Sequence, residues 1–112
     1  MRSVLFCCLL VLAACQAPNW RVQQIARAEA KMRREVGDPK AQFINVQLIG
    51  DQKTGQTCGL IQAAHGPASR FIVYIDGTAG PYIEGGGGPE HLANEAFYSA
   101  WESDCLAEGY VR

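Results

Sequence analysis

An apolar run near the amino terminus decides how much of this chain can fold into a domain. Residues 4–14 are apolar throughout, and a single positive charge, Arg2, precedes them. As a helix this run would span roughly 16 Å, against about 30 Å for the hydrocarbon of a bilayer. A basic start, a short apolar core and small residues at its end are typical of a secretory signal. The run is therefore expected to be removed rather than to join the core.

The last residues of this run narrow the interpretation. Residues 12–15 read LAAC, which resembles the lipobox of bacterial lipoproteins. In that family the cysteine thiol receives a diacylglyceryl group, the chain is cut just before the cysteine, and the new amine is usually acylated with a fatty acid such as palmitate. The resemblance implies that residues 1–14 are a removed signal peptide, that Cys15 carries the lipid anchor, and that residues 15–19 form a short tether.

Other interpretations of the amino terminus stay open: plain secretion, a retained signal anchor, or a buried helix or strand of a cytosolic protein. Ordinary signal cleavage wants small residues at the third and first positions before the cut. Leu12 disfavours a cut after Ala14, and Pro18 disfavours a cut after Ala17. The lipoprotein interpretation implies a periplasm-facing protein of the bacterial cell envelope. By analogy with lipoproteins of diderm bacteria, Gln16 favours transfer to the outer membrane.

Export also decides what the cysteines do. The chain has five cysteines, of which Cys7 and Cys8 would leave with the signal and Cys15 would carry lipid. The remaining pair, Cys58 and Cys105, would mature in an oxidising compartment, where such a pair is more often bridged than free. A disulfide there would stabilise the fold by about 4 kcal/mol on the chain-entropy model. A redox-active pair would instead favour C-x-x-C spacing, which these cysteines lack.

The rest of the chain has the length of one small domain, and we expect residues 20–112 to form it. Residues 20–36 predict an amphipathic helix that Asn19 caps and that ends at Gly37 before Pro39. Its apolar residues fall near one helical stripe: Val22, Ile25, Ala26, Met32 and Val36.

Alternating and β-branched segments follow and predict an antiparallel sheet of three to four strands. The expected strands are residues 41–49, 57–64, 71–76 and 81–84, with a polar turn at residues 50–56. In the first strand, alternation places Ile44, Val46 and Leu48 on one side of the sheet and Phe43, Asn45 and Gln47 on the other.

A second helix is predicted from Pro89 to about Ala107. Residues at helical spacing give it one apolar face: Ala93, Phe97, Ala100, Trp101 and Cys105. We expect this face to pack on the sheet, which would carry Cys105 toward Cys58. The predicted fold is therefore α+β, with an N-terminal helix, a small antiparallel sheet and a C-terminal helix packed on the sheet.

Three short segments of the predicted domain are similar to a group of small exported bacterial proteins, mostly uncharacterised. The segments are VGDPKAQF, TCGLI and RFIVY, within residues 36–76. In this group a helix ends at D-P-x-x-x-F and a strand carries C-G. The resemblance supports the fold and export, and it implies no activity.

The four glycines of residues 85–88 precede the second predicted helix, and a helix start can bind an anion through its backbone N–H groups. No Lys-Ser/Thr pair follows as in a P-loop, and Pro89 removes one donor. Glu84 and Glu90 would also repel an anion. A hinge or a tight chain crossing is the favoured interpretation.

Candidate metal ligands and catalytic side chains are few. His91 and Glu95 lie one helical turn apart, but zinc sites need three or four protein ligands and His65 is the only other histidine. No metal site and no cofactor are therefore predicted. Possible parts of a nucleophilic site lack a G-x-S-x-G elbow: Ser69, Ser99, Ser103 and Asp76. Three carboxylates near the end of the second helix are expected to be a solvated face: Glu102, Asp104 and Glu108.

Charge is unevenly distributed, although the net charge is only −1. Residues 20–35 contain five basic and two acidic residues, and residues 84–108 contain six acidic residues and no Lys or Arg. Residues 16–19 span at most about 14 Å, so the basic helix should begin close to the lipid surface. We predict membrane-surface contact for five residues of this helix, a solvated face being the alternative: Trp20, Arg21, Arg27, Lys31 and Arg34.

These observations favour a lipid-anchored, non-catalytic binding or structural module. Its partners would be the membrane and an envelope protein or cell-wall component. Export and the weak overall charge argue against nucleic acid. The alternative is a small envelope hydrolase that acts on cell-wall material, which would need a pocket that gathers His65, Asp76 and a serine, or two carboxylates at glycosidase distance.

Overall fold

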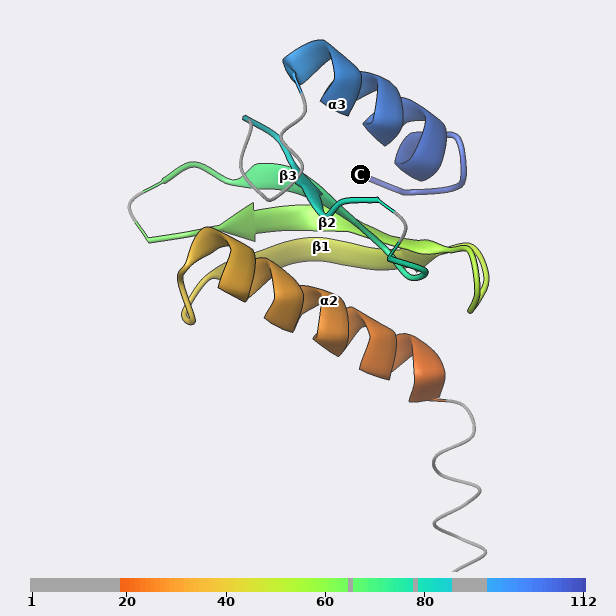
Figure 1. Cartoon of the computed structure of the whole chain (residues 1–112), viewed down its shortest axis with the longest axis horizontal. Coiled ribbons are helices and arrows are strands. Elements are labelled where there is room, and N and C mark those ends of the chain that lie inside the picture. Colours follow the sequence, from red (N-terminus) through yellow and green to blue (C-terminus); the bar gives the residue numbers. More distant parts are fainter. Residues whose placement is uncertain (1–18, 65, 78, 86–92) are drawn as a thin grey trace, which may run out of the picture.

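A computed structural model of the chain describes residues 19–64, 66–77, 79–85 and 93–112. Four strands form one antiparallel sheet in the order β1-β2-β3-β4, and helices α2 and α3 cover its opposite faces (Figure 1). The elements are α2 (Trp20–Val36), β1 (Gln42–Ile49), β2 (Gln56–Gln62), β3 (Ser69–Tyr74), β4 (Tyr82–Ile83), α3 (Asn94–Trp101) and a π-helical turn, η2 (Glu102–Leu106). The predicted α+β class is confirmed. The predicted signal peptide and Cys15 lie outside the described residues.

Helix α2 has the predicted bounds and the predicted end. Gly37 adopts a left-handed conformation (φ 69°), and its N–H donates to backbone oxygens of the last helical turn. Glycine is favoured there because a Cβ would be strained at positive φ. The predicted cap at the other end is wrong, because the Asn19 side chain makes no capping hydrogen bond.

The buried face of α2 is centred on Ala28 and Met32. The predicted stripe is partly wrong, because Val22 is 66% exposed and Ala26 is also exposed. The first turns of α2 also diverge from the sheet (Figure 1). At about 100° per residue, Ala26 lies about 140° around the helix from the middle of the Ala28 and Met32 directions.

Two hydrophobic clusters lie on opposite sides of the sheet. The cluster beneath α2 includes Ala28, Met32, Ala41, Ile61, Phe71, Val73 and Ile83. The cluster beneath α3 and η2 includes Ile49, Cys58, Ile72, Phe97, Trp101, Cys105 and Tyr110. β2 and β3 contribute alternate side chains to both clusters, which is why these two strands are buried on both faces.

β1 does not keep the simple alternation that its sequence predicts. Ile44 pairs with Leu60 and Gln47 pairs with Cys58, so Asn45 and Val46 both lie opposite Gly59. Asn45 has a φ of 50°, a conformation that asparagine tolerates better than most residues. The resulting bulge reverses the facing of the strand.

Because of the bulge, the predicted assignment of β1 side chains to the two faces of the sheet is wrong. Val46 packs together with Phe43 against the α2 cluster, although alternation places them on opposite faces. Ile44 points to the other face, where it is 44% exposed. A regular strand would have placed Ile44 and Val46 together.

The second helix is shorter and less regular than predicted. Its described part runs as α3 to Trp101 and then widens into η2, where the Ala107 N–H donates to the Glu102 carbonyl at 2.8 Å. The predicted start at Pro89 lies outside the described residues. Phe97, Trp101 and Cys105 are buried as predicted, whereas Ala93 is exposed.

The D-P-x-x-x-F segment joins α2 to the sheet. The Asp38 carboxylate accepts hydrogen bonds from the backbone N–H groups of Lys40, at 2.9 Å, and Ala64, at 3.0 Å. Phe43 packs edge-on against Phe71 with ring centroids 5.6 Å apart. The aspartate therefore ties the end of α2 to the end of β2, and the phenylalanine belongs to the core.

Candidate functional site

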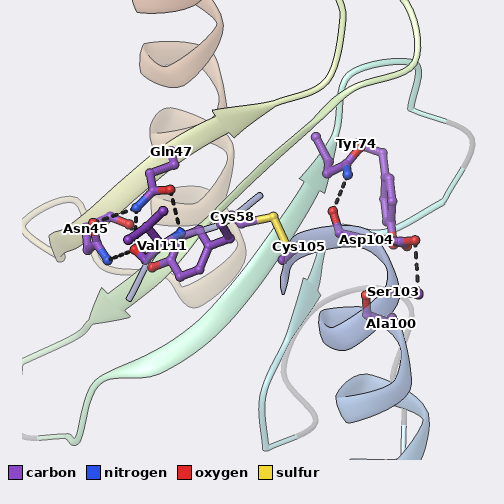
Figure 2. Close-up of a disulfide and its surroundings, with 11 residues drawn as sticks. Asn45, Gln47, Cys58, Tyr74, Ala100, Ser103, Asp104, Cys105 and Val111 are labelled. Carbon is purple, nitrogen blue, oxygen red and sulfur yellow. Dashed lines mark hydrogen bonds between the residues drawn. A yellow bond between two sulfur atoms is a disulfide. The ribbon is translucent and has the colours of Figure 1, made fainter. Parts of the chain in front are cut away.

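A disulfide fixes η2 to the sheet (Figure 2). The Cys58 and Cys105 sulfur atoms are 2.10 Å apart and their Cα atoms 6.1 Å apart. Both residues are fully buried. The predicted pairing is confirmed, and the bridge links the middle of β2 to η2.

Asp104, beside the disulfide, has hydrogen-bond partners for both its carboxylate and its backbone oxygen. The Tyr74 hydroxyl donates to the Asp104 carboxylate, and the Gln56 amide donates to the Asp104 backbone oxygen. The Ser103 hydroxyl also contacts this carboxylate, at 3.1 Å (Figure 2). Burial, followed by the hydrogen bond to Asp104, raises the pKa of Tyr74 well above its ordinary value. Asp104 therefore has a structural role that the sequence did not indicate.

The β1 bulge holds the segment that follows η2 (Figure 2). The side-chain amides of Asn45 and Gln47 both donate to the Val111 carbonyl, at 2.8 and 2.7 Å. The Val111 N–H donates to the Gln47 side-chain oxygen at 3.0 Å. The Tyr110 hydroxyl donates to the Asn45 carbonyl at 2.8 Å. These bonds fix Tyr110 against the sheet and place Arg112 next to it.

An arginine lies among aromatic rings on the same side of the sheet. Arg70 forms an ion pair with Glu84 of the next chain segment. Its guanidinium carbon lies 4.9 Å from the ring centroid of Tyr98 and 5.5 Å from that of Trp101. Hydrogen bonding between the two partners lowers the pKa of Glu84 and raises the pKa of Arg70. The arginine is therefore fixed and its charge is balanced by a neighbouring carboxylate.

A cavity of about 420 Å³ opens beside this arginine. We call it the Trp101 cavity. β1, β2 and β3 supply one side of it, and the chain from Trp101 onward supplies the other. Its lining consists of Ile44, Asn45, Leu60, Arg70, Trp101, Tyr110 and Arg112.

The basic residues predicted to contact a membrane do not all share one face of α2. At about 100° per residue, Trp20, Arg27, Lys31 and Arg34 fall within roughly 60° of one another, and the middle of this group lies about 110° from the middle of the Ala28 and Met32 directions. We call these four residues the basic face. Arg21 falls about 20° from the direction of Ala28, and its guanidinium carbon lies 4.7 Å from the Trp20 ring centroid. Arg21 therefore lies outside the basic face that the other four residues form.

Arg33, a further cation of α2, contacts residues of the sheet layer and has a structural role. Its Nε donates to the Ala41 carbonyl at 3.2 Å, and its guanidinium carbon lies 4.9 Å from the Phe43 ring centroid. By contrast, Arg34 is exposed. The helix thus separates a structural cation from cations that face solvent.

The charge asymmetry of the sequence is also an asymmetry in space. α3 and η2 carry exposed acidic residues, Glu95 and Glu102, and the exposed Glu108 follows them. These elements lie across the sheet from α2 (Figure 1). The described domain therefore has a basic outer helix on one side and an acidic one on the other.

The structure does not assemble the other candidates into a site. His65, His91 and the glycines at 86–88 lie outside the described residues. Asp76, Ser99 and Ser103 are exposed, and Ser69 is half-buried in β3. No group of three or more metal-ligating side chains occurs in the part of the chain that the structure describes.

The Trp101 cavity and the bulge that shapes it are not among the features predicted from the sequence. A glycine inside a strand is a known signal of a bulge or a close backbone approach, and Gly59 is such a residue. The pairing of Arg70 with Glu84 had no comparable signal, because it depends on β3 and the segment after β4 lying side by side.

The fold defines the class of this protein: an α+β domain in which an antiparallel meander lies between two helices. Comparisons with models of protein families, with curated proteins and with solved structures find no match. The resemblance to small exported proteins therefore stays a prediction. Among the described residues, no helix is both long and apolar enough to cross a bilayer.

Proposed function

We propose that this chain is a lipid-anchored, non-catalytic binding or structural module of the bacterial cell envelope, held at the outer membrane through Cys15. The observation that carries the proposal is the placement of charge. The basic face of α2 and the acidic residues of α3 and η2 lie on opposite sides of one sheet. A domain oriented by this asymmetry would rest α2 on anionic headgroups and turn α3 toward a partner in the envelope.

The position of α2 in the chain supports this orientation. Trp20 follows the proposed anchor Cys15 after four residues, which span at most about 14 Å. Tryptophan suits the boundary between lipid and water because its ring is apolar and its N–H is polar. Each cation near an anionic surface adds at most about 1 kcal/mol to the binding free energy.

The spacing along α2 determines how the helix must lie. Arg34 is about 21 Å from Trp20 along the helix axis. Charges are screened beyond about 8 Å at physiological ionic strength. Arg34 can therefore contribute only if α2 lies along the membrane surface rather than upright on it.

Intact-mass spectrometry of protein purified from bacterial membranes tests the anchor. The expected mass is that of a chain that begins at Cys15 and carries added lipid. A Cys15→Ala variant should lose the lipid and keep its leader. A native chain that begins at Met1, or one without added lipid mass, would contradict the proposal.

Vesicle binding tests the orientation, using a chain that begins at residue 16 and vesicles that contain phosphatidylglycerol. Arg27→Glu combined with Arg34→Glu should weaken association at least tenfold, because both cations lie on the basic face. Lys40→Glu combined with Lys53→Glu is the matched control, since it makes the same charge change at exposed residues outside α2. Equal losses of association in both variants would mean that binding depends on net charge and not on the basic face, which would contradict the proposed orientation.

A further inference from the structure

We infer that the Trp101 cavity binds a small aliphatic carboxylate, the chemistry of a medium-chain fatty acid. The cavity lies on the α3 side of the sheet, whereas the basic face of α2 lies on the other side. The inference therefore goes beyond the proposed membrane orientation and does not depend on lipid at Cys15.

The fold leaves the floor of this cavity apolar and uncovered. Ile44 and Leu60 are paired across β1 and β2, so their side chains form a continuous surface. η2 is fixed over Cys58, two residues along β2 from Leu60. The helical layer does not cover Ile44, which is 44% exposed. An aliphatic chain laid on this floor would lose apolar surface to the protein.

The wall of the cavity is held in place before any ligand arrives. Trp101 and Tyr110 are 3% and 6% exposed, and their ring centroids are 4.9 Å apart. The Tyr110 hydroxyl is bonded to the Asn45 carbonyl. A wall fixed in this way reduces the ordering cost of binding.

The charges around the cavity favour an anionic end on the ligand. The described residues that line the cavity include two arginines, Arg70 and Arg112, and no Asp or Glu. Glu84 already pairs with Arg70. Arg112 is exposed, and within the described part of the chain its side chain has no ion pair. Arg112 is therefore the cation available to a ligand, and a guanidinium binds a carboxylate through two parallel hydrogen bonds.

The volume of the cavity limits the length of the ligand's alkyl chain. About 420 Å³ is near the lower end of the range for small-molecule sites, which is about 300–1,000 Å³. Each buried methylene should tighten binding about fourfold. A ten-carbon carboxylate should therefore bind at least tenfold more tightly than a six-carbon one.

Photo-crosslinking of the full chain in the membranes of the expressing bacterium tests this inference. The probe is decanoic acid with a diazirine near its terminal carbon, and labelled peptides are identified by mass spectrometry. We expect labels on the peptides that contain Ile44 and Leu60. Competition by decanoate should need at least tenfold less compound than competition by decanol, because only decanoate supplies the charge. Labels mainly on residues 20–36 would indicate contact with the membrane alone and would overturn the inference.

Variants separate the cavity from non-specific labelling. Arg112→Gln should need about tenfold more probe for half-maximal labelling, whereas Lys53→Gln makes the same charge change outside the cavity and should leave labelling unchanged. Ile44→Asp changes an exposed side chain, so folding should persist while labelling falls at least tenfold. Unchanged labelling in both cavity variants would overturn the inference. Stronger competition by a peptide with an apolar C-terminal residue than by decanoate would also overturn it.

These outcomes are distinct from those that test the lipid anchor. A chain without lipid at Cys15 would still be expected to show labelling that depends on Arg112. A lipidated chain whose labels ignore Arg112 and Ile44 would retain the proposed anchor and lose the proposed ligand.

Discussion

Val46 lies directly over Gly59, and the space between them admits no further carbon atom. A Cβ added to Gly59 would lie 2.8 Å from Val46 Cγ2 and 3.2 Å from Phe71 Cε1. Because side chains alternate along a strand, the two residues of the C-G pair serve opposite faces. Cys58 bonds to η2, and Gly59 admits the β1 bulge on the side of α2. The presence of this dipeptide in β2 is therefore explained by packing and the disulfide, and the explanation requires no catalytic role.

Gly59→Ala should lower the free energy of unfolding by about 2 kcal/mol, because overpacking forces the bulge or Phe71 to move. Urea denaturation followed by circular dichroism measures the change. Gly66→Ala is the matched control, since a Cβ there meets only a carbonyl oxygen at 4.0 Å. The control should change stability by less than about 0.5 kcal/mol. Equal effects of the two substitutions would contradict the close approach at Gly59.

Replacing Cys58 and Cys105 together by alanine should lower the free energy of unfolding by about 4 kcal/mol. The bridge closes a long loop, with a sequence separation of 47 residues. Its loss therefore gives the unfolded chain a large gain in conformational entropy. Denaturation with and without reductant provides the measurement. Reductant should destabilise the wild-type protein and leave the double variant unchanged. Equal sensitivity of the two proteins would be inconsistent with this disulfide.

The sequence predicted those parts of the fold whose signals are local. The end of α2 at Gly37 follows from the need for a residue at positive φ, and the bounds of the helix agree with the pattern. The disulfide was also predicted from the sequence, because the expected export would leave two cysteines and the second helix turns Cys105 toward the sheet. The helix end depends on one local rule, whereas the disulfide prediction combined the number of cysteines with the apolar face of the second helix.

Features that depend on neighbouring strands could not be predicted in the same way. The bulge at Asn45 reverses the facing of β1 because Gly59, in another strand, leaves room for Val46. The exposure of Ile44 depends on that reversal and on where the disulfide holds η2. The Trp101 cavity therefore results from long-range packing, which no periodicity in a single segment records.

Tyr74 and Asp104 make the stability of the protein sensitive to alkali. The folded protein raises the pKa of Tyr74 above its unfolded value of about 10. A raised pKa means that the stabilisation is complete below about pH 10 and is lost as the pH rises further. Tyr74→Phe should cost about 1 kcal/mol at pH 7 and should flatten the decline above pH 10. Urea denaturation from pH 7 to 11 measures both effects, and an unchanged alkaline slope would contradict this role.

Glu84 and Arg70 should make the protein sensitive to acid. Hydrogen bonding to Arg70 lowers the pKa of Glu84 in the folded protein. A lowered pKa means that the stabilisation is present above the unfolded value of about 4.3 and is lost as the pH falls through the folded value. Glu84→Gln should cost about 1 kcal/mol at neutral pH, a modest value because both side chains are partly exposed.

The same substitution should flatten the loss of stability below about pH 4.3, where the unfolded wild-type chain takes up a proton at this carboxyl group before the folded protein does. Glu95→Gln, at an exposed position on α3, removes one carboxylate without touching Arg70 and should retain the wild-type profile. Urea denaturation between pH 3 and 7 measures the three proteins together. If Glu84→Gln and Glu95→Gln gave the same acid profile, the effect would reflect total charge rather than the ion pair that holds Arg70 beside Trp101.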